Sequence, residues 1–189
     1  MADGYPLQAF LRDVAGIVVE EQEPARIVRL LTPLLRRFAI EGAGLPAHLL
    51  HWPHEGAGAS LLHEEGDDSF FVIATVLPPG AATTIHYHGD WRAAVLMRGE
   101  QEETTYRRAD EGSDLTCAEI AEEGRARQTA GSVSAMAAGG YHSAKNDGGV
   151  DALLIAILAG TPDDHPYYRY DAEAKALRRE QIELLKAAR

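Results

Sequence analysis

Cysteine, positive charge and long apolar stretches are all scarce in this sequence. Cys117 is the single cysteine among 189 residues, which excludes an internal disulfide and fits a reducing cytoplasm. Lysine and arginine number 18 against 29 acidic residues, and the net charge of −11 argues against nucleic acid and anionic membrane surfaces as partners. No run of about 18 apolar residues occurs, and the N-terminus lacks the features of a signal peptide. We therefore expect a cytoplasmic protein that does not bind membranes.

The chain has the length of a single domain, in which we expect three segments. Residues 1–58 predict a helical segment and a loop, because apolar positions recur at helical spacing and Pro24 suits the first turn of a second helix. Residues 59–160 alternate short β-like runs with turn signals, which indicates an all-β sandwich or barrel. Residues 161–189 predict a loop and a closing helix over 172–187.

Two histidines stand one residue apart between the β-like runs 70–77 and 93–97. Alternate side chains of a strand share a face, so His86 and His88 point the same way, about 7 Å apart along the chain. Two imidazoles on one face can converge on one metal ion. The best candidate for a third ligand is His142, which follows a glycine pair.

Together these stretches resemble the two motifs of the cupin superfamily, G-x5-H-x-H-x3-E-x6-G and G-x5-P-x-G-x2-H-x3-N. The matching positions are Gly80, His86, His88 and Gly99 in the first motif and Gly131, Gly139, His142 and Asn146 in the second. Arg92 stands where the first motif has a carboxylate ligand, and Ala137 replaces the proline of the second. The resemblance implies an all-β cupin barrel, an RmlC-like jelly roll, with two N-terminal helices and a C-terminal helix. It also implies a metal on His86, His88 and His142.

Three neutral imidazoles would leave the charge of a divalent metal uncompensated. Such a site favours an anionic ligand, a thiolate or a carboxylate, and leaves positions open for oxygen. Arg92 cannot be a ligand because it stays protonated, and a guanidinium close to a dication is repelled unless an anion lies between them. One interpretation is that Arg92 binds the carboxylate or phosphate of a substrate. The other is that a bulge turns it outward, or that it pairs with Asp90 at the rim.

The run 86–99 is similar to the thiol dioxygenases, of the cysteine dioxygenase type and especially the 3-mercaptopropionate dioxygenase type. That family places non-haem Fe(II) on three histidines in a cupin barrel and oxidises a thiol to a sulfinate with O2. Its Ser-His-Tyr triad is missing here, since the corresponding positions are Ile155, Ile157 and Ala159. Arg92 replaces the cysteine or glycine of the family, and Ser60 stands roughly where the family has its carboxylate-binding arginine.

We therefore expect an Fe(II)-dependent dioxygenase that adds O2 to a small organic acid or thiol. Ni, Zn and Mn are alternative metals, because all accept imidazole ligands. Candidate substrate-binding residues are Arg92, the neighbouring Trp91, and Arg169, near which the mercaptopropionate type carries an arginine. Candidate catalytic residues are Arg92 and Tyr141.

Two other functions remain open at this point. One is a cupin oxygenase that cleaves a C–C bond of a diketone or an aromatic acid. The other is a cupin that binds a metal or a ligand without catalysis. In each case we expect a small molecule as the partner, and a chain that is a monomer or a homodimer.

Overall fold

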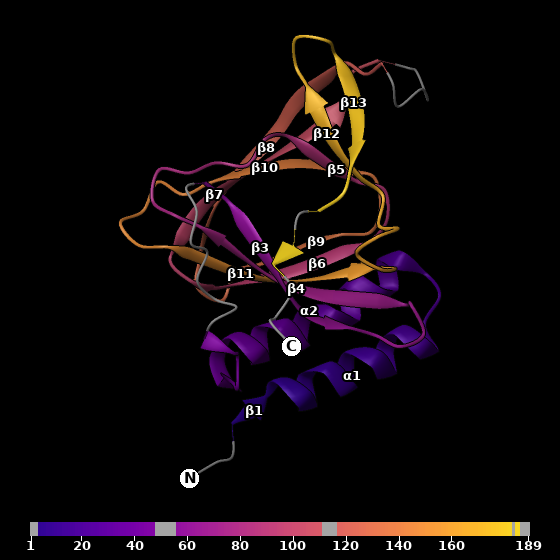
Figure 1. Cartoon of the computed structure of the whole chain (residues 1–189), viewed down its shortest axis with the longest axis vertical. Coiled ribbons are helices and arrows are strands. Elements are labelled where there is room, and N and C mark those ends of the chain that lie inside the picture. The colour runs from indigo at the N-terminus through magenta and orange to yellow at the C-terminus, as the bar shows by residue number, and fades with distance from the viewer. Residues whose placement is uncertain (1–3, 48–55, 111–116, 183, 186–189) are drawn as a thin grey trace.

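The computed structural model describes residues 4–47, 56–110, 117–182 and 184–185. Two helices are followed by strands that form two six-stranded sheets, stacked with one face of each toward the other (Figure 1). A short parallel pair, β1 (Tyr5–Pro6) and β2 (Gly42–Ala43), brackets the two helices.

We call the first six-stranded sheet the apolar sheet. Its order is β14-β3-β4-β11-β6-β9, with the bounds Leu184–Leu185, Gly58–Glu64, Phe70–Leu77, Ala152–Ala159, Arg92–Arg98 and Val133–Met136. We call the second the histidine sheet. Its order is β13-β12-β5-β10-β7-β8, with the bounds Ala176–Glu180, Tyr167–Asp171, His86–His88, Gly140–Lys145, Glu100–Arg108 and Ile120–Thr129.

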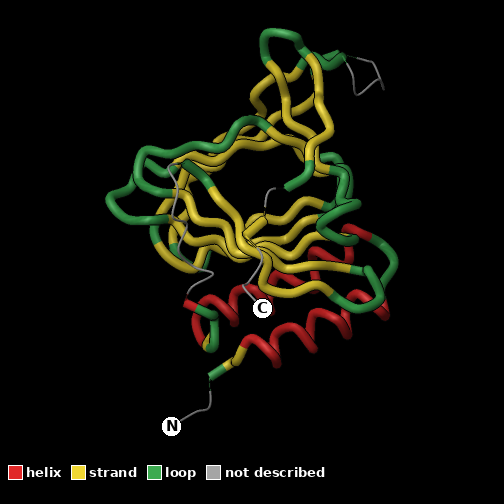
Figure 2. Tube along the Cα trace, in the orientation of Figure 1, coloured by secondary structure: helices red, strands yellow, loops and turns green. Residues whose placement is uncertain are grey.

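The two expected N-terminal helices are present and cover the outer face of the apolar sheet (Figure 2). They are α1 (Leu7–Glu20) and α2 (Pro24–Glu41), the second beginning at a proline as expected, because the first helical turn needs no partner for that N–H. Phe10 of α1 stacks on Phe38 of α2 with ring centroids 4.3 Å apart, and both side chains are fully buried. This packing joins the helices to the strands beneath them in one core.

The central strands of the apolar sheet are buried on both faces. Along β11, Ile155 packs toward the helices while Leu154 and Ala156 pack on the opposite, inner face. A strand between two apolar layers has no need of polar residues at alternate positions, which explains the nearly uninterrupted apolar sequence of β4 and β11.

The predicted C-terminal helix over 172–187 is wrong in the part of it that the structure describes. The chain instead forms the β12–β13 hairpin, which extends the histidine sheet, and β14, which pairs in parallel with β3 (Figure 1). The turn is made by Asp171, whose carboxylate accepts the N–H groups of Glu173 and Ala174, and by Lys175 at a φ of +48°. Strand pairing and the burial of Leu177 outweigh the helical spacing of the local sequence.

The expected barrel is also not closed. Among the described strands, no pairing joins one six-stranded sheet to the other, so the molecule is an open two-sheet sandwich of the jelly-roll kind. Neither of the described helices is long and apolar enough to cross a membrane.

Candidate metal centre

The histidine sheet brings the three predicted ligands together. His86 and His88 lie on β5, and β10 pairs antiparallel with β5 so that His142 is directly opposite His86. All three side chains are buried and face the apolar sheet. One ring nitrogen of each lies within 4.8 Å of the others. The structure thus gathers the residues that the two sequence motifs indicated, and their role as ligands stays a prediction.

Hydrogen bonds hold His86 and His142 in a defined tautomer. Nδ1 of His86 donates to the carbonyl oxygen of Thr84 at 2.9 Å, and Nδ1 of His142 donates to Oε1 of Glu103 at 2.9 Å. A carbonyl and a carboxylate only accept, so the ring proton of each histidine is on Nδ1 and Nε2 keeps its lone pair.

His88 reaches the same tautomer through a second histidine. Nδ1 of His165 donates to the carbonyl oxygen of Ala159 at 2.9 Å, so Nε2 of His165 is an acceptor. Nδ1 of His88 donates to that nitrogen at 2.9 Å, which leaves Nε2 of His88 as the free lone pair. Partners behind the ring that orient an imidazole in this way are a general feature of metal-binding histidines.

These residues fit a divalent metal ion. Nε2 of His142 is buried and has no hydrogen-bond partner within the described chain, an arrangement that is costly unless another group uses the lone pair. Burial lowers the pKa of His86 to about 4, and it holds the pKa of His88 and of His142 well below the ordinary value. The rings are therefore neutral at pH 7, which is the form that binds a metal.

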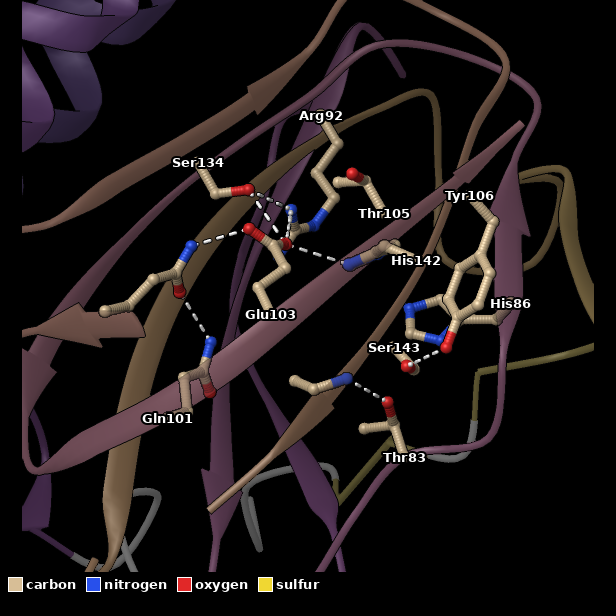
Figure 3. Close-up of polar contacts among 12 residues, drawn as sticks. Thr83, His86, Arg92, Gln101, Glu103, Thr105, Tyr106, Ser134, His142 and Ser143 are labelled. Carbon is tan, nitrogen blue, oxygen red and sulfur yellow. Dashed lines mark hydrogen bonds and ion pairs between the residues drawn. The ribbon is translucent and has the colours of Figure 1, made fainter. Parts of the chain in front are cut away.

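Glu103 is the centre of the polar contacts behind His142 (Figure 3). Besides the bond from His142, this buried carboxylate accepts hydrogen bonds from Oγ of Ser134 at 2.9 Å and from Nε2 of Gln128 at 2.6 Å. Nη1 of Arg92 lies 3.8 Å from Oε1. The carboxylate is thus bound on the side of His142 away from Nε2, where it orients the ring.

Arg92 faces the space between the sheets. Its side chain is 6 % exposed, and Nη1 donates to Oγ of Ser134 at 3.3 Å (Figure 3). Burial lowers the pKa of Arg92 and Glu103 opposes that shift, so the guanidinium remains charged. Asp90 accepts the N–H of Trp91, and the carboxylate that compensates Arg92 is Glu103. The outward and rim placements of Arg92 are therefore both wrong.

A cavity of about 430 Å³ lies between the two sheets, and the three histidines and Arg92 line it. Tyr167 of β12 lines it as well, because it pairs with His88 and its ring lies 5.2 Å from the ring of His86. Burial raises the pKa of Tyr167 to about 12, so its hydroxyl keeps its proton at neutral pH.

Of the three other predicted site residues, only Arg169 lines the cavity, and it is opposite His86 in the pairing of β12 with β5. Trp91 packs into the core between the helices and the apolar sheet, and it does not line the cavity. Tyr141 is on the outer face of β10, with its ring 4.6 Å from that of Tyr87, because neighbouring residues of a strand point to opposite faces. It therefore does not line the cavity, and its predicted catalytic role stays a prediction. Arg169 is at the exposed mouth of the cavity and donates to Glu180 at 2.6 Å.

Sequence reasoning missed Glu103, His165 and Tyr167. Glu103 is one of several acidic residues in its strand, and the spacing does not say which of them faces inward. His165 and Tyr167 are separated by one residue, as His86 and His88 are, but only the packing of this segment against β5 places them beside His86 and His88.

No family model matches the sequence, and no curated protein matches it. Among solved structures, a Klebsiella pneumoniae protein with a double-stranded β-helix domain is similar at 15 % identity and a TM-score of 0.48, over 67 % of this chain and 89 % of that one. The cupin domain of Schizosaccharomyces pombe Cnp3 shares 18 % identity with a TM-score of 0.45, over 63 % and 74 %. An oxalate oxidase in complex with glycolate shares 16 % with a TM-score of 0.46, over 66 % and 58 %. Similarity at this level does not indicate an activity for this protein. The activity has to be inferred from the residues of the site.

Proposed function

We propose that this protein is a metal-dependent dioxygenase that holds Fe(II) on His86, His88 and His142 and oxidises a small anionic organic molecule with O2. The observation that carries the proposal is the convergence of three neutral imidazoles, each with its Nε2 lone pair available, on a cavity that can hold a small molecule. Three nitrogen ligands leave coordination positions for a substrate and for O2.

The charges around the site favour an anion. Arg92 and Glu103 compensate each other at 3.8 Å, and the three histidines are neutral, so the charge of a bound dication remains uncompensated. Glu103 is the anion beside Arg92, but it lies behind His142 and does not reach the Nε2 side of that ring. A substrate carboxylate or thiolate would compensate the metal itself.

Each side chain has a defined part in this proposal. Glu103 and His165 orient two of the ligand rings from behind. The N–H groups of Arg92 that are not used by Ser134 are available to hydrogen-bond the acid group of a substrate. Tyr167 can donate a hydrogen bond from its protonated hydroxyl toward a bound anion. Bound Fe(II) would supply the one-electron chemistry with O2 that no side chain of the site offers.

Oxygen uptake tests the proposal directly. The metal-free protein is loaded anaerobically with Fe(II) and mixed with thiols, carboxylic acids and diketones, while an electrode records O2. We expect uptake that depends on one of these compounds, on Fe(II) and on His142. The matched controls are protein loaded with Zn²⁺, which has no redox chemistry, and the His142→Ala variant.

The compound that stimulates uptake distinguishes the subclasses. Uptake with a thiol supports thiol oxidation, and uptake with a diketone or an aromatic acid supports C–C cleavage. Compounds that bind to the Fe(II) protein without any uptake would show that it is a metal- and ligand-binding protein, and the proposal would be wrong.

Substitution of Arg92 tests the anion-binding part. A buried charge-assisted hydrogen bond contributes roughly 1.5–3 kcal/mol, so Arg92→Gln should reduce the affinity for an anionic substrate by about 10- to 150-fold. The control is Arg98→Gln on the exposed end of the same strand, which should leave affinity unchanged. Metal content, measured on the same samples, should change little because arginine is not a ligand. Unchanged substrate affinity in Arg92→Gln would show that the acid group binds elsewhere, with Arg169 at the mouth as the next candidate.

A further inference from the structure

The two walls of the cavity differ in polarity. The metal ligands, Glu103 and Tyr167 all come from the histidine sheet. The apolar sheet contributes hydrocarbon to the opposite wall, apart from Arg92 and Thr75. The main residues of that wall, which we call the apolar wall, are Ile73, Leu154, Ala156 and Leu158.

The apolar wall begins beside Arg92 and extends away from it. In the pairing of β11 with β6, Leu158 is opposite Arg92, Ala156 is opposite Ala94 and Leu154 is opposite Leu96. Alternate residues of a strand share a face, so Leu158, Ala156 and Leu154 form one stripe about 13 Å long. A molecule with its acid group at Arg92 would have this stripe beside the rest of its length.

We propose that the ligand of this cavity is an amphiphilic carboxylic acid, with its carboxylate at Arg92 and the metal and an aliphatic or aromatic body of several carbons on the apolar wall. This inference names the substrate class of the proposed function and rests on it for the position of the acid group. It selects against the smallest polar acids, which would leave Ile73, Leu154 and Ala156 in contact with water.

Size and burial support this ligand. A volume of about 430 Å³ is within the range of small-molecule sites, which are mostly apolar with a few polar groups that set orientation. Burial of one methylene group changes affinity by about 4-fold. Added carbons should therefore increase affinity as long as they cover the apolar wall.

The experiment measures binding, so that it does not depend on turnover. Straight-chain carboxylates from acetate to octanoate are titrated calorimetrically into Zn²⁺-loaded protein and into metal-free protein. We expect affinity to rise by about 2- to 4-fold per methylene over at least the first four additions, in both forms. The metal-loaded form should bind every acid more tightly, by a factor that does not depend on chain length.

Two substitutions in the apolar wall test where the body of the acid binds. Ala156→Leu fills the space beside the apolar wall. It should reduce the affinity for octanoate by about 10-fold or more, while the affinity for acetate should change by less than about 3-fold. Leu154→Gln keeps the size of the side chain but places an amide on the apolar wall. The affinity should then rise less with each added methylene group than it does in the wild type. The control is Val150→Gln, at an exposed position outside the cavity. We expect its affinity to depend on chain length as in the wild type. Metal content per chain shows whether each variant is folded.

The outcomes separate this inference from the proposed function. Affinity that is flat or falls with chain length overturns the inference while metal binding and oxygen uptake still support a dioxygenase. A wild-type dependence in both Ala156→Leu and Leu154→Gln also overturns it, because the body of the acid would then bind elsewhere. Affinity that rises with chain length, without oxygen uptake for any compound, supports the ligand class and contradicts the oxygenase.

Discussion

The two sheets have the same number of strands but different residues on their faces. Strand β11 of the apolar sheet is buried at all of its positions, because helices cover one side and the second sheet the other. Strand β5 of the histidine sheet is buried at His86 and His88 but only half-buried at Tyr87, whose face the two helices do not cover (Figure 2). The apolar sheet therefore contributes most of the core, and the histidine sheet contributes the three histidines that could hold a metal ion.

This difference indicates how a buried polar site is tolerated in a small domain. The buried polar groups of the histidine sheet are hydrogen-bonded, as Glu103 is to His142 and Gln128 of the same sheet and to Ser134 of the apolar sheet. Among the described buried side-chain nitrogen and oxygen atoms, Nε2 of His142 is the one without a hydrogen-bond partner, and it is one of the three ring nitrogens that could hold a metal ion. Substitutions of the buried polar residues of the histidine sheet should thus affect metal binding, and substitutions between the helices and the outer face of the apolar sheet should affect stability.

The largest effect on metal binding should come from His142→Ala. Removal of one of three ligands should reduce metal content from about one per chain to near zero in elemental analysis, with the far-ultraviolet circular dichroism unchanged. The control is His63→Ala on β3 of the apolar sheet, where the imidazole bonds to Glu65 outside the cavity. Equal metal content in both variants would remove His142 from the ligand set.

Phe38→Ala tests the role of the apolar sheet and its two helices in stability. Phe38 is fully buried between α1, α2 and the apolar sheet, so the cavity left behind should lower the free energy of unfolding by about 3–5 kcal/mol. Urea denaturation measures the loss. Metal content and ligand affinity of the folded fraction should equal those of the wild type. A loss of metal at full stability would contradict the division between the two sheets.

The metal-free protein should lose stability on mild acidification. His86 has a pKa of about 4 in the folded chain and an ordinary value near 6.5 when unfolded, so the unfolded state binds more protons between these pH values. Stability is then full above about pH 6.5 and falls as the pH decreases toward 4, by about 3 kcal/mol for this one group. His88 and His142 act in the same direction.

Urea midpoints of chelator-treated protein between pH 7 and pH 5 measure this dependence. His86→Gln removes the titrating group and should reduce the slope. A midpoint that does not change over this range would mean that the rings are not held neutral by burial.

Glu103→Gln should have the smallest of the four effects. The amide can still contact Nδ1 of His142, but the orienting charge is lost, and such changes typically weaken metal binding by 10- to 100-fold. The control is Glu102→Gln on the same strand, whose carboxylate pairs with Arg125 at the surface. Competition with a metal-sensitive dye measures the affinity. Equal affinities in the two variants would exclude a positioning role for Glu103.

Part of the site could be predicted from the sequence because its pattern is local. The period of a strand places His86 and His88 on one face whatever the rest of the chain does, and the second motif supplied His142. Glu103 could not be predicted, because which acidic residue of β7 faces inward depends on how β7 pairs with β10 and β8. The same holds for Tyr167, which lies in the segment that the sequence indicated as a loop before the helix and which the structure pairs with β5.

The sequence by itself determined the two N-terminal helices, the β-rich middle and the three histidines, because each depends on a short-range period or spacing. Only the tertiary structure decided that Arg92 faces inward against Glu103, that Trp91 packs into the core under the helices, and that residues 176–180 and 184–185 form paired strands. These outcomes depend on strand register and on burial between layers. Both are set by residues distant in the sequence, since one step of register turns every side chain of a strand to the other face.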